Sequence, residues 1–166
     1  MLINSANLMG GSAEPDNSRG FGRVHLAAGM PMDGKGHLSL LVADSSRTSI
    51  DAFGVNKVDV KIDGEVGLEL RVTLCWFDPP TTAMSAIQLQ HDLDLEVVSP
   101  SGAKYTMWES GDADSVNVIE RVIVPAASTM DGMWTISVSA GGLLFDKQSY
   151  SLVITGAIVG YQETRG

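Results

Sequence analysis

The chain has 166 residues, of which 44% are hydrophobic and 19% charged. Its length is typical of about one domain, and its apolar content is sufficient for a core. Eleven Lys and Arg against twenty Asp and Glu leave a net charge of -9, which disfavours nucleic acid and anionic membranes as partners. No apolar run approaches the ~20 residues that span a bilayer. The composition therefore indicates a soluble domain that binds neither nucleic acid nor membrane.

The first 36 residues carry little periodicity. Residues 1–9 lack a basic leader and their apolar run is broken by asparagines, so they do not have the pattern of a signal peptide. Residues 10–18 are rich in turn formers and predict a loop, and a second loop is expected over residues 30–36. The single cysteine, Cys75, excludes an internal disulfide, and its place in a strand pattern favours a small buried hydrophobe over a reactive thiol.

From residue 38 onward short strands alternate with turns. The expected strands are 38–43, 58–62, 66–76, 93–97, 104–108, 116–124, 134–140 and a last one from residue 150. Gly67 is a candidate bulge in the third of these. We expect Leu74 and Ile136, on the apolar faces of two strands, to meet in the core. About eight short strands predict an all-β fold, a two-sheet antiparallel sandwich that is jelly-roll-like.

Acidic residues gather around the strand over residues 93–97. Leu93, Leu95 and Val97 share one parity, and Asp92, Asp94 and Glu96 share the other, so three carboxylates line one side of the strand. Asp78 ends the preceding strand at a proline turn. This pattern has two interpretations, a solvated outer face or a site for a hard cation such as calcium.

Glu120 breaks an otherwise apolar face in the segment 116–124. A carboxylate there is costly unless it is paired or ligating, so we expect either a buried salt bridge with Arg71 or Arg121 or a structural or metal-binding role. Asp112 and Asp114 have the Asp-x-Asp spacing of a calcium loop but lack the glycine and distal glutamate of an EF-hand. A solvated loop is the favoured interpretation of that pair. The candidate metal ligands are therefore Asp78, Asp92, Asp94 and Glu120.

Four motifs occur in a characteristic order. They are LRVTLCWFDPP at residues 70–80, HDLDLEVVSPSGAKY at 91–105, NVIERV at 117–122 and GMWTISV at 132–138. Together they resemble the carboxyl-terminal β-sandwich domain of a branch of the subtilisin-like serine proteases, the KP-43-like subtilases. Near the start, residues 2–6 resemble the end of the helix that follows the nucleophile helix of subtilases, and residues 19–26 resemble their closing segment.

The resemblance implies a division of the chain. Residues 1–33 would be the end of the subtilase catalytic domain and a linker, and residues 34–166 the carboxyl-terminal domain. The subtilase segments around the catalytic Asp, His and Ser are absent. His91 and Asp92 are neighbours whose side chains leave a strand on opposite faces, so they do not suggest a triad. We therefore expect no peptidase activity from this chain alone.

The resemblance also implies a function. The domain would be a non-catalytic accessory domain that packs on the subtilase catalytic domain of the same parent chain, stabilises it and shapes substrate access. Bound calcium and a secreted location would follow. The alternative is a free-standing carbohydrate- or protein-binding sandwich, in which the tryptophans Trp76, Trp108 and Trp134 would form a sugar-stacking platform instead of core and sheet-edge contacts.

Overall fold

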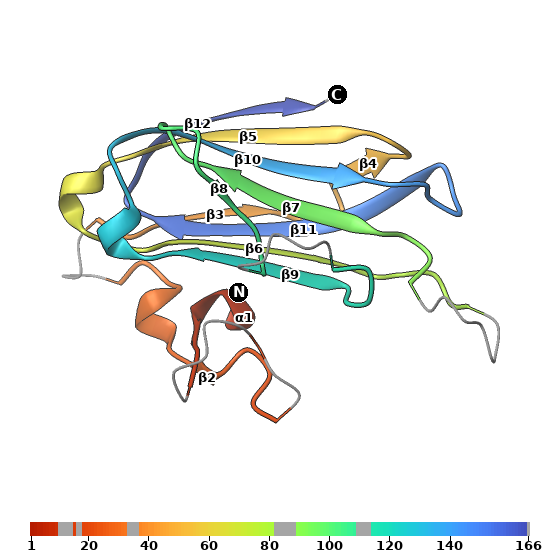
Figure 1. Cartoon of the computed structure of the whole chain (residues 1–166), viewed down its shortest axis with the longest axis horizontal. Coiled ribbons are helices and arrows are strands. Elements are labelled where there is room, and N and C mark those ends of the chain that lie inside the picture. The colour runs from red at the N-terminus through yellow and green to blue at the C-terminus, as the bar shows by residue number, and fades with distance from the viewer. Residues whose placement is uncertain (10–14, 16–17, 33–36, 82–88, 109–113, 166) are drawn as a thin grey trace.

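Two antiparallel sheets packed face to face form the molecule (Figure 1). The structure is a computed structural model that describes residues 1–9, 15, 18–32, 37–81, 89–108 and 114–165. The first sheet has the order β12-β5-β10-β7-β8, with β12 at Ile158–Arg165, β5 at Val55–Ile62, β10 at Gly132–Ala140, β7 at Leu93–Val98 and β8 at Lys104–Tyr105. The second has the order β3-β11-β6-β9, with β3 at Ser39–Ala43, β11 at Lys147–Gly156, β6 at Leu70–Trp76 and β9 at Ile119–Val124. A short strand, β4 (Ser49–Asp51), also pairs with β11.

This strand order is that of a jelly roll. If β3 and the seven strands from β5 to β11 are numbered one to eight along the chain, the sheets read 1-8-3-6 and 2-7-4-5. Most connections therefore cross between the sheets, as expected for two interlocked Greek keys. The predicted two-sheet antiparallel sandwich is confirmed, and β4 and β12 are additions that the sequence pattern did not indicate.

Strand alternation places the core between the sheets. Leu74 on β6 and Ile136 on β10 are both fully buried, as predicted. Side chains of the same parity surround them: Val60, Ile62, Leu70, Val72, Trp76, Leu93, Leu95, Val97, Val122, Val124, Trp134, Val138, Leu152 and Ile154. Trp76 and Trp134 thus serve the core, because burial of large apolar surface is the main stabilising term in folding.

Two expected strands begin later than predicted. Residues Gly64–Val66 form a 3-10 turn, η2, in which the Asp63 carboxylate accepts a hydrogen bond from the Glu65 N–H. Gly67 follows with φ of +68°, a left-handed conformation that glycine adopts readily, so β6 starts only at Leu70. Similarly, the Asp114 carboxylate accepts the N–H groups of Val116 and Asn117 and holds them in a turn, so β9 starts at Ile119.

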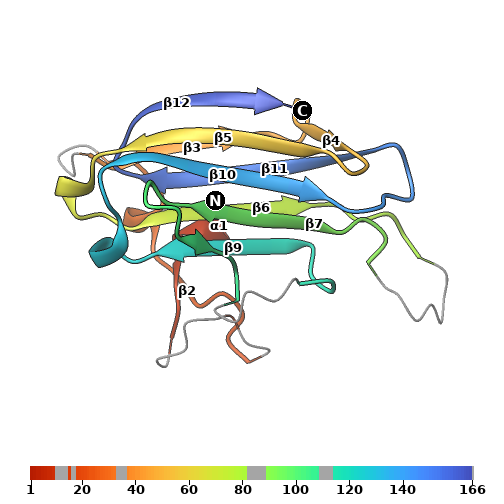
Figure 2. The same cartoon turned by 45° about the horizontal axis from the view of Figure 1, so that its top comes forward.

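The described part of the N-terminal segment, residues 1–9, 15 and 18–32, packs on the outer face of the β3-β11-β6-β9 sheet (Figures 1 and 2). It contains α1 (Leu2–Ser5), the paired strands β1 (Ala6–Asn7) and β2 (Arg23–Val24), and the 3-10 turn η1 (Leu26–Ala28). A third 3-10 turn, η3 (Ala126–Ser128), follows β9. In the part of the chain that the structure describes, no helix is long and apolar enough to cross a membrane.

Candidate functional site

Two groups of charged side chains flank strand β9. The first, the arginine clamp, consists of Arg71 on β6 and Arg121 on β9. The second, the carboxylate cluster, consists of Asp92, Asp94, Asp114 and Glu120. Because successive strand residues point to opposite faces, Arg121 faces the N-terminal segment and Glu120 faces the space between the two sheets.

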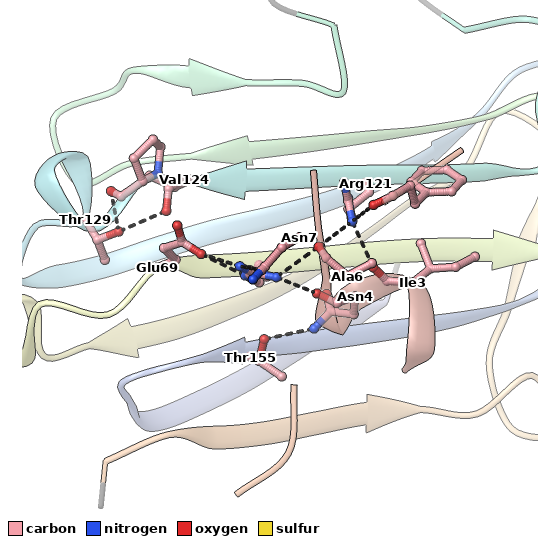
Figure 3. A network of polar contacts seen from close by, with 12 residues as sticks. Ile3, Asn4, Ala6, Asn7, Glu69, Arg121, Val124, Thr129 and Thr155 are labelled. Atoms are coloured by element: carbon pink, nitrogen blue, oxygen red, sulfur yellow. Dashed lines mark hydrogen bonds and ion pairs between the residues drawn. The ribbon is translucent and has the colours of Figure 1, made fainter. Parts of the chain in front are cut away.

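Arg71 of the clamp is buried beneath the N-terminal segment, with 6% of its surface exposed. Its Nη1 donates to the carbonyl oxygens of Asn4 and Ala6, at 3.3 and 3.2 Å. Its Nη2 donates to Asn7 Oδ1 at 2.8 Å and to Glu69 Oε2 at 2.6 Å (Figure 3). Arg71 therefore has both a counter-ion and acceptors from the docked segment.

Arg121 is equally buried, with 4% exposed, but its partners are neutral. Its Nη1 donates to the carbonyls of Ile3, Ala6 and Phe21 at 2.9, 3.0 and 3.3 Å, as Figure 3 shows. The guanidinium also lies over the Phe21 ring, 5.1 Å from its centre. Burial, and secondarily the charge of Arg71, lowers the pKa of Arg121 to about 10. The buried Nη2 has no hydrogen-bond partner.

Neutral polar contacts complete the docking of the segment. Asn4 Nδ2 donates to Thr155 Oγ1 at 2.8 Å, and Thr73 Oγ1 donates to Asn4 Oδ1 at 3.0 Å. Asn4, Thr73 and Thr155 are all buried. The N-terminal segment therefore covers Arg71 and Thr73 on the outer face of β6, whereas Cys75 on the same face is half-buried.

Glu120 of the carboxylate cluster joins the two sheets. It lies opposite Leu74 in the β6–β9 register, is 4% exposed, and its Oε2 accepts a hydrogen bond from Leu95 N–H on β7 at 2.6 Å. The Leu95 N–H lies on the edge of β7 that faces β8. Because β8 pairs with β7 only at Val97 and Val98, it does not cover this N–H. The alternative of a salt bridge is wrong, since the arginines of the clamp point to the opposite face of the sheet.

Burial makes Glu120, Asp92 and Asp94 harder to ionise, and neighbouring carboxylates add to this for Glu120 and Asp92. Burial, followed by the charges of Asp94, Asp114 and Asp92, raises the pKa of Glu120 from its ordinary value of 4.5 to about 8, against the lowering effect of the Leu95 N–H. The pKa of Asp92 is raised by burial and then by Asp94, Asp114 and Asp78, and that of Asp94 by burial. Asp92 Oδ1 is buried and has no hydrogen-bond partner.

The carboxylates of Asp78 and Asp114 both accept hydrogen bonds from backbone N–H groups. The two oxygens of Asp78 accept the N–H groups of Gln90 and His91 at 2.8 and 2.7 Å. Asp114 is 6% exposed, so the interpretation as a solvated loop is wrong for this residue. Asp112 lies outside the described residues. The Asp-x-Asp spacing was the signal that could have placed Asp114 in the cluster.

The fit of a calcium ion to the four candidate ligands is uneven. Asp92 has a buried oxygen without a partner and Glu120 has one hydrogen bond, so both could accept a cation. Asp78 already caps two N–H groups. Among the described residues, no three or more His, Cys, Asp or Glu side chains converge as a metal centre. Calcium binding at Asp78, Asp92, Asp94 and Glu120 stays a prediction.

His91 is committed to structural contacts. It is 1% exposed, its Nε2 accepts the Phe145 N–H at 3.1 Å, and its Nδ1 contacts Gln148 Oε1. Because Nε2 accepts, the proton of the neutral ring belongs on Nδ1. His91 carbonyl oxygen also accepts the Trp76 indole N–H, so this histidine ties the end of β6 to β11.

Comparison with known proteins adds no family. A scan against protein-family models finds no match, and a search of curated proteins finds no relative. The class that fold and site define is therefore an all-β jelly-roll sandwich that carries an N-terminal segment on the outer face of one sheet.

Proposed function

We propose that this chain is a non-catalytic carboxyl-terminal accessory domain of a subtilisin-like serine endopeptidase. The observation that carries the proposal is the arginine clamp. Its two buried guanidinium groups hold the backbone carbonyls of Ile3, Asn4 and Ala6, and residues 2–6 resemble the end of the helix that follows the nucleophile helix of subtilases. The sandwich would then be fastened directly to the end of the protease.

The energetics of the clamp support a permanent attachment. A buried charge is costly unless its donors are satisfied, and the acceptors for Arg121 all come from the N-terminal segment. Detaching the segment would leave two arginines on an uncovered sheet face. It would also expose the carbonyls that now accept hydrogen bonds from them. The clamp therefore couples the stability of the sandwich to that of whatever the segment belongs to.

The outer side of the N-terminal segment offers surface for a further protein body. Leu2, Val24, Leu26 and Met32 are 62%, 47%, 51% and 52% exposed. Several exposed apolar side chains within one short segment are typical of a surface that another domain covers. The covering body in this proposal is the remainder of the catalytic domain, with which residues 1–33 would be continuous.

Calcium belongs to the same proposal as a stabilising ion. Asp92, Asp94 and Glu120 would hold it at the junction of β7 and β9, and Asp78 would act on it through its charge. A bound cation would supply the counter-charge that these buried and partly buried carboxylates lack. The chain's own contribution is to keep these carboxylates close together through the Glu120 bond to Leu95 N–H.

The test uses the full-length protein that the reading frame upstream encodes. That protein should contain Asp, His and Ser segments of a subtilase and hydrolyse casein in a phosphonate-sensitive manner, whereas the present chain should not. Arg121→Gln in the full-length protein should shorten the half-life of that activity at raised temperature. The matched control is Arg47→Gln, on the exposed turn between β3 and β4.

Two results would contradict the proposal. An upstream frame without a phosphonate-reactive serine would favour the free-standing binding module. An activity half-life equally unaffected by both arginine variants would show that the clamp does not stabilise the protease.

A further inference from the structure

A cavity of about 1090 Å³ lies between the N-terminal segment, strand β9 and the chain that follows β8. Ligand sites commonly have volumes of ~300–1,000 Å³, so this cavity has room for a short peptide. Its lining includes both arginines of the clamp. It also includes Lys104, Tyr105, Met107 and Trp108.

The cations and anions of this lining do not balance. Glu69 forms an ion pair with Arg71 at 2.6 Å, and Glu96 forms one with Lys104 at 2.8 Å. Both carboxylates of the lining are thereby engaged. Among the described residues Arg121 has no carboxylate partner, although it is 4% exposed.

The unpaired nitrogen of Arg121 indicates that the cavity lacks a hydrogen-bond acceptor. Arg121 Nη2 is buried and makes no hydrogen bond, whereas buried donors in folded proteins are almost always paired. The planar guanidinium matches a carboxylate better than other partners, because two N–H groups can meet two oxygens. Since this atom has no contact with solvent, a ligand must displace part of the cavity lining to reach it.

We propose that this cavity binds a carboxylate of a polypeptide, with the carboxylate paired to Arg121 and an adjacent apolar side chain against Tyr105 and Trp108. The carboxylate comes either from a free carboxyl terminus or from an acidic side chain. Lys104 also lines the cavity and brings a second cationic side chain, which now pairs with Glu96. The proposal does not rest on the association with a protease, because it uses only residues of the present chain.

The first experiment compares three peptides by NMR titration of the chain: N-acetyl-Phe-Leu as the free acid, N-acetyl-Phe-Leu-amide, and N-acetyl-Phe-Glu-amide. Hydrogen bonds to charged groups contribute about 1.5–3 kcal/mol. At least one of the two carboxylate peptides should therefore bind about tenfold more tightly than the neutral amide. Which one does so distinguishes a carboxyl terminus from an acidic side chain. Equal affinity of all three, or no binding by either carboxylate peptide, would overturn the proposal.

The second experiment uses a matched pair of lysines. Lys104 and Lys147 are similarly exposed, at 67% and 66% of their side chains, and each pairs with one carboxylate, but only Lys104 lines the cavity. Lys104→Ala should weaken binding of the preferred peptide about two- to fivefold, and Lys147→Ala should leave it unchanged. Equal effects of the two variants would sink the idea.

A third variant examines the guanidinium itself. Arg121→Lys keeps the charge but removes the planar donor fork, and it should lose about tenfold in affinity for the preferred peptide. Thermal unfolding of the variant shows whether it is folded, and if it is not, the lysine pair decides. Wild-type affinity in a folded Arg121→Lys chain would contradict pairing with Arg121.

Discussion

The arginine clamp and the carboxylate cluster meet on one strand, where Arg121 and Glu120 are consecutive residues that face opposite sides of β9. Both side chains are 4% exposed, yet their surroundings differ. Arg121 finds three carbonyls and an aromatic ring in the N-terminal segment, whereas Glu120 finds one N–H and three like charges. Burial disfavours the charged form of both side chains, lowering the pKa of Arg121 to about 10 and raising that of Glu120 from 4.5 to about 8. The comparison teaches that acceptors from another segment offset this cost for Arg121, whereas Glu120 has one N–H to offset it.

The largest expected effect follows from the pKa of Glu120. Its pKa in the folded chain, about 8, exceeds its ordinary value of 4.5, so the unfolded chain loses this proton first. The free energy of unfolding is therefore not reduced by Glu120 below about pH 4.5, where this side chain is protonated in both states. It falls as the pH rises from there to about 8. With about 1.4 kcal/mol for each pKa unit, the loss is about 5 kcal/mol.

Glu120→Gln should remove most of this loss, because a neutral amide can still accept the Leu95 N–H. Urea unfolding between pH 5 and pH 9 would measure it as a flatter dependence of the free energy of unfolding on pH. A variant with the same slope as the parent would show that Glu120 is not the group responsible.

Calcium should have the next largest effect. A cation in the carboxylate cluster would favour the ionised carboxylates and stabilise the fold by about 2.7 kcal/mol when free calcium is one hundred times its dissociation constant. The melting temperature in millimolar calcium should therefore exceed that in chelator, with a smaller gain in magnesium because magnesium demands tight octahedral geometry.

Two variants make the calcium measurement specific. Asp94→Asn should reduce the gain, whereas Asp51→Asn, at an exposed ion pair with Lys147, should not. A melting temperature that is the same in calcium and chelator would contradict calcium binding at Asp78, Asp92, Asp94 and Glu120 and favour the interpretation of the acidic face as a solvated surface.

Breaking the clamp should cost about 1–3 kcal/mol, the usual cost of leaving buried acceptors unpaired. Arg121→Met would leave the carbonyls of Ile3, Ala6 and Phe21 without this donor. We expect faster amide hydrogen exchange in residues 1–32 while the core of the sandwich stays protected. The control is Arg19→Met, which removes an exposed arginine that also donates to a carbonyl, that of Met9. Similar exchange in both variants would mean that the clamp does not hold the segment.

The part of the fold that depends on alternation was predictable. Period-two patterns identified the core faces of β6, β7 and β10 and singled out Glu120 as a carboxylate on an apolar face. Gly67 was harder, because a glycine in a strand pattern fits both a bulge and the left-handed end of a turn, and the structure has the turn.

The burial of the clamp could not be read from local pattern. Arg71 and Arg121 occupy positions that alternation assigns to an outer face, and they are buried because described residues of the N-terminal segment return to cover them. Arg121 and Ile3 are 118 residues apart in the chain, and no periodicity encodes such a contact. The sequence pattern also favoured a solvated loop for Asp114. Its carboxylate instead accepts the N–H groups of residues 116 and 117, and this contact depends on a turn that the pattern did not predict.

The smallest expected effect comes from Glu96, which separates burial from net charge. It lies on β7 beside the cluster, but its side chain is 35% exposed and pairs with Lys104 at 2.8 Å. Exposed ion pairs contribute at most about 1 kcal/mol, so Glu96→Gln should change the free energy of unfolding by less than that and keep the parent's dependence on pH. The variant removes the same single negative charge as Glu120→Gln. If both variants flattened the pH dependence equally, the net negative charge of the whole chain would be the cause of the lost stability. The difference in cost between the two buried side chains of β9 would then no longer be supported.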